Sequence, residues 1–275
     1  FTEGNPMQII FVAVLIGMAM LILGNKATVA AAFVEQSNYI IHLIMEAVSS
    51  FVPVFVFGSI LNMILGNNFS VFLPAYKLVL VMLMGDAVLL AVYLVLVCTR
   101  RKVQPRVLLK KMMPTFLIAL TTASSSAAFG VNMECCEKDL GIDKRIVNFG
   151  IPLGQVIFMP GVSVMFLAVG FCMAEIYGVM VSPAWLATAC LIAIVLAVAA
   201  PPIPGGALTC YMILFVQLKI PMEAVAVTIA LNVILEFIAT AVNLFCLQAE
   251  LVELAAGFDM LDVRKLREKK KVLNS

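Results

Sequence analysis

The chain has 275 residues, of which 63% are hydrophobic and 12% are charged, and its mean hydropathy is +1.10. Ordinary soluble domains carry roughly 45–50% apolar and about 25% charged residues, so this composition predicts a membrane protein. A net charge of +2 and a single histidine argue against a nucleic-acid-binding domain. The seven cysteines are scattered along apolar stretches, which argues against a disulfide framework or a metal knuckle.

Five long apolar runs predict helices that span the membrane: residues 7–24, 39–65, 71–98, 146–177 and 221–248. The chain begins with Phe1, and no basic segment with a cleavage site precedes the first run. We therefore expect the chain to be part of a longer protein.

Two further apolar stretches are interrupted in the middle. Residues 112–133 carry no charge but contain a run of hydroxyl side chains around Ser124, Ser125 and Ser126. Residues 183–218 are split by prolines and glycines between Ala200 and Gly206, which cannot continue a helix. The arms of this second stretch hold about 18 and 12 residues, or about 27 and 18 Å. Because the shorter arm cannot cross a core of about 30 Å, we expect a re-entrant hairpin.

Charge indicates the same arrangement for the first interrupted stretch. Basic residues lie on both of its sides, and the positive-inside rule places both flanks in the cytoplasm. With two hairpins, every lysine and arginine except Lys77 and Lys219 falls on the cytoplasmic side. The charged tail at residues 257–275 then lies in the cytoplasm, where its basic residues can meet anionic lipid.

Two interrupted segments that open from opposite sides, each followed by a long helix, are typical of an inverted-repeat transporter with its site at the hairpin tips. A channel built from two half-helices would give a similar pattern. An intramembrane enzyme is not supported, because His42 has no clear Ser or Cys nucleophile beside it and no paired aspartates occur on facing helices.

The last apolar run carries a polar stripe. Asn232, Glu236, Thr240 and Asn243 fall within an arc of about 80° on a helix. A carboxylate at membrane depth costs about 2.5–3.5 kcal/mol and indicates a functional site, although Glu236 could also bond to a neighbouring helix. The three serines could hold a carboxylate at a half-helix or simply allow close packing.

Other polar residues leave two interpretations open. His42 and Glu46 lie one turn apart, as in a proton relay, but their stripe is also typical of packing between helices. Asp86 could have a structural partner or a coupling role.

The order of these elements resembles the transport core of the dicarboxylate/amino-acid:cation symporters, the glutamate transporters and their bacterial relatives, over about residues 1–256. Its motifs lie in the second half of the chain: Ala123–Ala127 resembles the tip of the first hairpin, Ile151–Gly154 the start of the seventh helix, Ile203–Gly206 the second tip, and Asn232–Asn243 the last helix. The family's first three helices have no counterpart here.

The resemblance implies an all-α membrane protein with an elevator-type, glutamate-transporter-like fold and a homotrimeric assembly. It divides the chain into membrane helices at 1–98, partly scaffold and trimer contacts, a transport domain at 99–256, and the tail at 257–275. Within the transport domain we expect hairpin 1 at 106–138, a broken helix at 144–177, hairpin 2 at 183–219 and the last helix at 221–250.

Several residues depart from the family pattern. Where the family has Asn-Met-Asp-Gly-Thr at its sodium-binding break, this chain has Phe158-Met159-Pro160-Gly161-Val162, and Leu247 replaces a second sodium-binding aspartate. Ala239 replaces the arginine that reads an acidic side chain. Glu236 and Asn243 stand where the family holds the substrate's amino group and main-chain carboxylate.

The residues and this resemblance together predict a secondary active transporter, a cation-coupled symporter of an amino acid or small carboxylate. We expect a small neutral substrate that bears an amino group, and coupling to protons rather than to sodium. The predicted substrate site comprises Ser124, Ser125, Ser126, Ile203, Pro204, Gly205, Glu236, Thr240 and Asn243. The predicted coupling site for H⁺ or Na⁺ comprises Glu236, Asn232, Met159 and Gly161. We expect no organic cofactor, no metal centre and no nucleic-acid partner, and a location in the plasma (inner) membrane. A passive pore and a degenerate, non-transporting paralogue are the alternatives.

Overall fold

The computed structural model describes residues 6–50, 72–200 and 207–268. Within these ranges the secondary structure is helical, apart from one isolated antiparallel bridge between Ile142 and Leu261. The predicted all-α class is therefore confirmed for the described residues. The chain divides into two compact units, residues 1–66 and residues 67–275, which we describe separately.

The first unit contains two helices, α1 (Pro6–Leu23) and α2 (Thr28–Ser50), joined by a 3-10 turn at Gly24–Ala27. Gly24 has a φ of +52°, a conformation that glycine adopts without a steric penalty. The first predicted helix matches α1 closely. The second was expected to begin at residue 39, but α2 begins at Thr28, because the alanines after it favour a helix although Glu35 interrupts the apolar run. Residues 51–65 of that expected helix lie outside the described residues.

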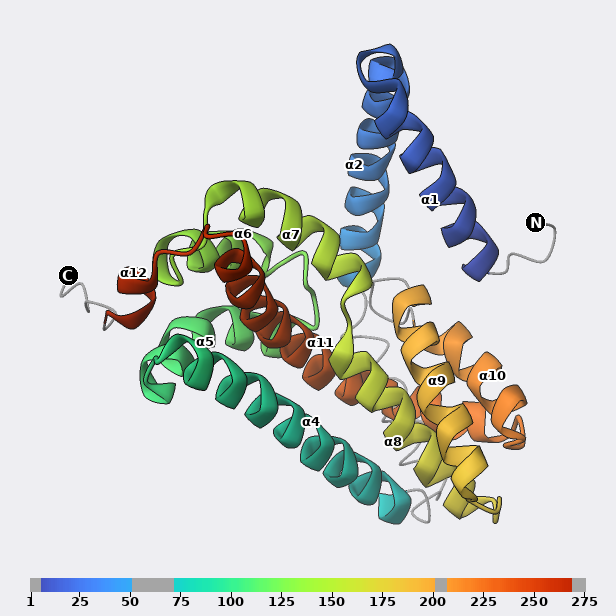
Figure 1. Ribbon diagram of the computed structural model, residues 1–275. Coiled ribbons are helices and arrows are strands. Elements are labelled where there is room, and N and C mark those ends of the chain that lie inside the picture. The colour runs from blue at the N-terminus through green and yellow to red at the C-terminus, as the bar shows by residue number, and fades with distance from the viewer. Residues whose placement is uncertain (1–5, 51–71, 201–206, 269–275) are drawn as a thin grey trace. The chain divides into compact units, whose positions relative to one another are not determined.

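The other helices of the described residues lie in the second unit (Figure 1). In chain order they are α4 (Phe72–Arg101), α5 (Pro105–Thr122), α6 (Phe129–Glu134) with a π turn at Cys135–Asp139, α7 (Lys144–Ile157), α8 (Pro160–Ile176), α9 (Pro183–Ala199), α10 (Ala207–Leu218), α11 (Ala224–Gly257) and α12 (Val263–Arg267).

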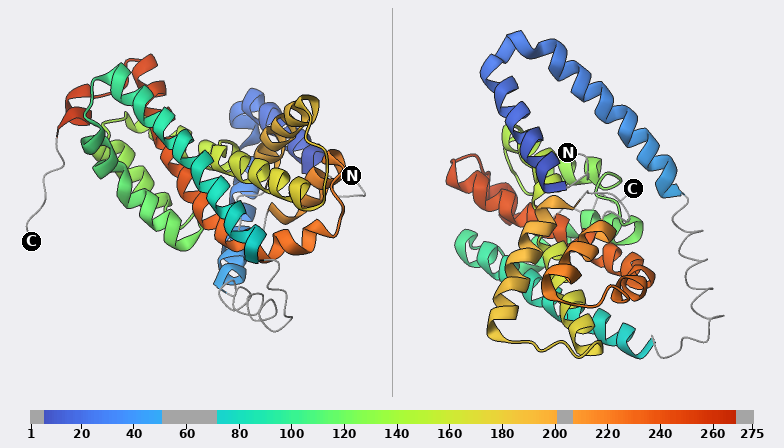
Figure 2. Two further views of the ribbon diagram at one scale, coloured as in Figure 1. Left: turned by 90° about the horizontal axis from the view of Figure 1, so that it is seen from below. Right: turned by 90° about the vertical axis from the view of Figure 1, so that its right-hand side faces the viewer.

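Helix α11 connects the two hydrophobic cores of this unit. One core joins its first half to α8, α9 and α10, and the other joins its second half to α5, α6 and α7. With 34 residues, α11 is about 50 Å long, which is enough to pass through both cores. Helix α4 packs on α8 and α11 and runs beside α11 (Figure 2). By packing, α4 therefore belongs with the helices that follow it.

The range 144–177, which the resemblance assigns to a broken helix, contains two helices. Helix α7 ends at Ile157 and α8 begins at Pro160, so two residues separate them. The last helix begins at Ala224 rather than at residue 221 and continues to Gly257, beyond the predicted end. Charged residues do not end it, because Glu253 pairs with Arg101 of α4 while Leu251 and Val252 on the same helix are buried.

Both predicted hairpins contain two helical arms. In hairpin 1, α5 is followed by a turn and by α6. In hairpin 2, α9 has 17 residues and α10 has 12, close to the expected arm lengths, and the two arms pack together. The predicted tip residues Ile203, Pro204 and Gly205 lie outside the described residues.

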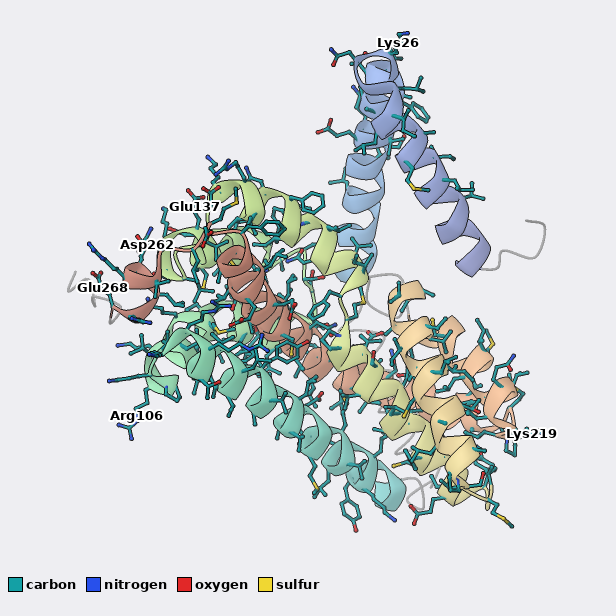
Figure 3. All side chains as sticks on the ribbon, viewed as in Figure 1. Lys26, Arg106, Glu137, Lys219, Asp262 and Glu268 are labelled. Atoms are coloured by element: carbon teal, nitrogen blue, oxygen red, sulfur yellow. The ribbon has the colours of Figure 1, made fainter. Side chains whose placement is uncertain are left out.

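Charged residues gather at the ends of the second unit. Arg106, Glu137, Asp262 and Glu268 lie at the end that carries α12, and Lys219 lies at the opposite end (Figure 3). The first residues of the predicted tail are folded, since Leu266 is fully buried in the core formed with α5. Among the described residues, four stretches are long and apolar enough to cross a membrane: Leu15–Ser37, Tyr76–Arg101, Lys144–Ile176 and Ile234–Gly257.

Candidate functional site

The site is organised by the break between α7 and α8. Pro160 occupies the first position of α8, where its missing N–H group causes no loss. The preceding residue, Met159, provides no side-chain cap. Asn243 of α11 caps the helix instead, because its Oδ1 accepts hydrogen bonds from the N–H of Gly161 at 2.8 Å and of Val162 at 3.3 Å. A side chain of α11 thus holds the start of α8 in place at the break.

A cavity of about 50 Å³ lies between the break, the two hairpins and α11. At about 10–15 Å³ per molecule it has room for about four waters. Its lining consists of Ala123, Ser125, Gln155, Phe158, Met159, Val162, Met165, Ala200, Ala207, Glu236, Ala239, Thr240, Asn243 and Leu244. Among the described residues of this lining, Glu236 is the charged one, so the cavity has a negative potential when that carboxyl is ionised.

The polar stripe of α11 reaches the cavity through three of its four members. Glu236, Thr240 and Asn243 line it, and each is half-buried. Asn232 does not line it, since its side chain is buried and its Oδ1 accepts a hydrogen bond of 2.9 Å from the hydroxyl of Tyr211 on α10. In this structure Asn232 therefore joins α11 to hairpin 2.

The serines of hairpin 1 have different surroundings. Ser125 lines the cavity, whereas Ser126 is exposed and does not. The Ser124 hydroxyl accepts a hydrogen bond from the N–H of Ala127 at 3.2 Å and so stabilises the turn. Ala123 ends α5 with a φ of +49°, a left-handed conformation that costs a non-glycine residue about 1–2 kcal/mol. The structure thus brings one of the three predicted serines into the lining.

Gln155 is a cavity residue that the sequence interpretation missed. It lies near the end of α7, and its Nε2 atom is buried and has no hydrogen-bond partner among the described residues. The available signal was an amide in an apolar segment three residues before the predicted break. A buried, unsatisfied donor in a cavity wall is the arrangement expected of a group that meets a ligand or water.

The sequence allows two interpretations for Asp86, and two for the pair formed by His42 and Glu46. Asp86 of α4 is 2% exposed, and neither carboxyl oxygen has a hydrogen-bond partner among the described residues. The structural partner that was one option for Asp86 is thus absent from these residues. The side chains of His42 and Glu46 lie outside the described part of α2, so the relay stays a prediction.

The residues predicted for cation coupling offer few side-chain ligands. Met159 lines the cavity and Gly161 lies beside it, bonded to Asn243. Within the described ranges, no three His, Cys, Asp or Glu side chains come together as a possible metal site. A hard cation held at the break would depend on backbone carbonyls and on the oxygens of α11.

The family model and the relatives that match this chain all carry the names of transporters or symporters. A family model described as "Sodium:dicarboxylate symporter family" matches residues 1–248. A Caenorhabditis elegans protein named excitatory amino acid transporter is 26% identical over 248 residues, which cover 88% of this chain and 49% of that protein. The serine/threonine transporter SstT of Bifidobacterium adolescentis is 29% identical over 252 residues, covering 88% of this chain and 57% of that protein.

A third relative matches a shorter region. Human excitatory amino acid transporter 2 is 30% identical over 128 residues, which cover 46% of this chain and 22% of the human protein. The chain therefore spans about half the length, or less, of these curated relatives.

Proposed function

The chain belongs to the sodium:dicarboxylate symporter family, as its motifs predict, and from this premise we propose that it forms the core of a cation-coupled secondary transporter for a small neutral substrate with an amino group. The family and the apolar helices make it an integral membrane protein. The observation that carries the proposal is the cavity at the helix break, where Glu236 faces the same space as Ser125, Thr240 and Asn243.

We propose that the cavity binds the ammonium group and the main-chain carboxylate of an amino acid. The Glu236 carboxylate attracts an ammonium group, while the Ser125 and Thr240 hydroxyls and the Asn243 amide can donate to a carboxylate. Among the described residues, no lysine, arginine or histidine lines the cavity, and Ala239 stands where the family pattern has an arginine. A second, acidic carboxylate would be buried without a cation, which is costly, so a neutral side chain fits better.

We further propose that both hairpins are re-entrant and act as gates in an elevator-type cycle within a homotrimer. Room for about four waters is little for an amino acid, so the tips must separate for substrate to enter. Ser124 and Ser126 at the first tip, and Ile203, Pro204 and Gly205 at the second, are the proposed gate residues. A plasma (inner) membrane location and a cytoplasmic C-terminus complete this proposal and are supported by the clustering of basic residues.

Coupling is proposed to use a proton or sodium. Glu236 is the first candidate for a coupling proton because it is half-buried in the cavity. Asp86 is a second candidate, because its buried carboxyl oxygens have no hydrogen-bond partner among the described residues.

The test is uptake by the full-length protein in proteoliposomes under a sodium gradient or a proton gradient. Glu236→Gln should abolish coupled uptake, whereas Glu250→Gln, which removes an exposed carboxylate of the same helix, should leave it unchanged. Unaltered uptake by Glu236→Gln would remove Glu236 from the site. Strict sodium dependence would refute proton coupling, and conductance without saturable counterflow would indicate a pore.

A further inference from the structure

Gln155 presents a donor for which the described residues provide no acceptor. Its Nε2 atom is buried without a hydrogen-bond partner, although the side chain lines the cavity. A buried donor left unpaired costs about as much as a lost hydrogen bond, so native proteins keep one mainly where a water or ligand completes it.

Among the described residues, the other buried side-chain atoms that have no hydrogen-bond partner lie outside the cavity lining. Asn132 Nδ2 and Gln248 Oε1 belong to side chains that already bond to each other, Gln248 Nε2 to Asn132 Oδ1 at 2.8 Å. The Asp86 oxygens lie on α4, outside the cavity lining. Gln155 thus combines an unpaired donor with a place in the wall of the binding cavity.

The neighbouring groups restrict what could pair with this donor. The carbonyl oxygen of the Asn243 amide is occupied by two backbone N–H groups of α8. Glu236, Ser125 and Thr240 are the groups that the proposed function assigns to the amino-acid part of the substrate. Gln155 is left to meet the substrate's side chain, where its amide can donate to a hydroxyl, carbonyl or carboxylate oxygen. Because the described lining holds no cation to balance a carboxylate, an uncharged hydroxyl or carbonyl oxygen fits this place.

We propose that Gln155 is a specificity-determining residue, and that the substrates are amino acids with a neutral polar side chain, a hydroxyl or an amide. This inference rests on the proposed function and narrows its substrate class. A site that hydrogen-bonds a polar substrate rejects an apolar analogue of the same shape, because the site's own donor is then left unpaired.

Threonine and valine have nearly the same shape and differ in this one hydroxyl, so they are the direct probes. In counterflow by the full-length protein, threonine should be preferred over valine by roughly 5- to 150-fold, the range that the cost of an orphaned buried donor gives. Gln155→Met keeps the length of the side chain and removes its amide, so the ratio should fall to about one. Gln217→Met makes the same change on the exposed face of α10 and should keep the wild-type ratio.

Gln155→Leu provides a second apolar variant if the methionine variant does not fold. An unchanged threonine-to-valine ratio in a folded Gln155 variant overturns the role of Gln155 while leaving the proposed function in place. Equal transport of threonine and valine by the wild-type protein also overturns it. An absence of counterflow for any amino acid overturns the proposed function and this inference together.

Discussion

Gly161 is the position at which the break in the helix can be tested most directly. It is the second residue of α8 and lies against α11. A Cβ atom added there would lie 2.6 Å from the backbone oxygen of Ala239, 3.0 Å from Val242 Cβ and 3.1 Å from Asn243 Oδ1. The first contact is with the backbone of a long helix, which cannot turn aside as a side chain can.

We predict that Gly161→Ala destabilises the protein by about 0.5–4.5 kcal/mol. Replacing glycine by alanine inside a helix normally gains about 0.5–1 kcal/mol. Here, overpacking costs about 1–3 kcal/mol, and displacing the Asn243 cap adds about 0.5–2 kcal/mol. Together the two costs exceed the helix gain, and the displaced cap should also lower substrate transport.

Two other glycines supply matched controls. Gly130 of α6 has no atom within 4 Å of an added Cβ, so Gly130→Ala should be neutral or stabilising by up to about 1 kcal/mol. At Gly154 the added atom would meet Leu247 Cδ1 at 2.2 Å, but that is the end of a flexible side chain, so Gly154→Ala should cost less than Gly161→Ala.

The assay is thermal unfolding of the purified variants in detergent, together with uptake in proteoliposomes. If Gly161→Ala is as stable and as active as Gly130→Ala, the close approach of α8 to α11 is refuted, and with it the cap provided by Asn243.

Two further predictions concern the end of the unit that carries α12. The Asp143 carboxylate accepts hydrogen bonds from the guanidinium and the backbone N–H of Arg145, and both lower the pKa of this carboxyl. The stability that Asp143 contributes should therefore be complete at neutral pH and be lost as the pH falls below the ordinary pKa of 3.8. Asp143→Ala should lower the unfolding temperature at pH 7, with little difference from wild type in strong acid. Lys111 donates to the backbone oxygens of Asp139, Lys265 and Leu266 at 2.8, 2.6 and 3.0 Å, so Lys111→Met should release the segment around α12 and speed its proteolysis, whereas equal cleavage of variant and wild type would contradict this anchoring role.

Local signals in the sequence indicated the apolar segments of the second unit that form α4 and α11. The cluster of prolines and glycines after Ala200 predicts the separation of α9 from α10. The break at Pro160 is instead implied by the resemblance, because a single proline does not always interrupt a helix: Pro114 and Pro152 lie inside α5 and α7. The helical period places Glu236, Thr240 and Asn243 on one face, and α11 presents that face to the cavity.

Pairings between distant segments had no local signal. The buried Lys111 joins α5 to residues 265 and 266, and nothing near Lys111 in the sequence indicates that partner. Asn232 shares the period of the polar stripe, yet Tyr211 binds it, because hairpin 2 packs over that end of α11. Gln155 was missed because periodicity alone does not show which face of α7 meets the cavity.

Asn243 shows how the structure refines a role that the resemblance implies. The family pattern assigns this amide to the substrate's main-chain carboxylate, but its Oδ1 already accepts from Gly161 and Val162. Those two amides, at the positive end of α8, are therefore satisfied from within the protein and not available to an anion. If Asn243 also reads the carboxylate, it must do so through Nδ2, assisted by Ser125 and Thr240. A single neutral cap thus links the geometry of the helix break to substrate binding, so a change at Gly161 should alter both.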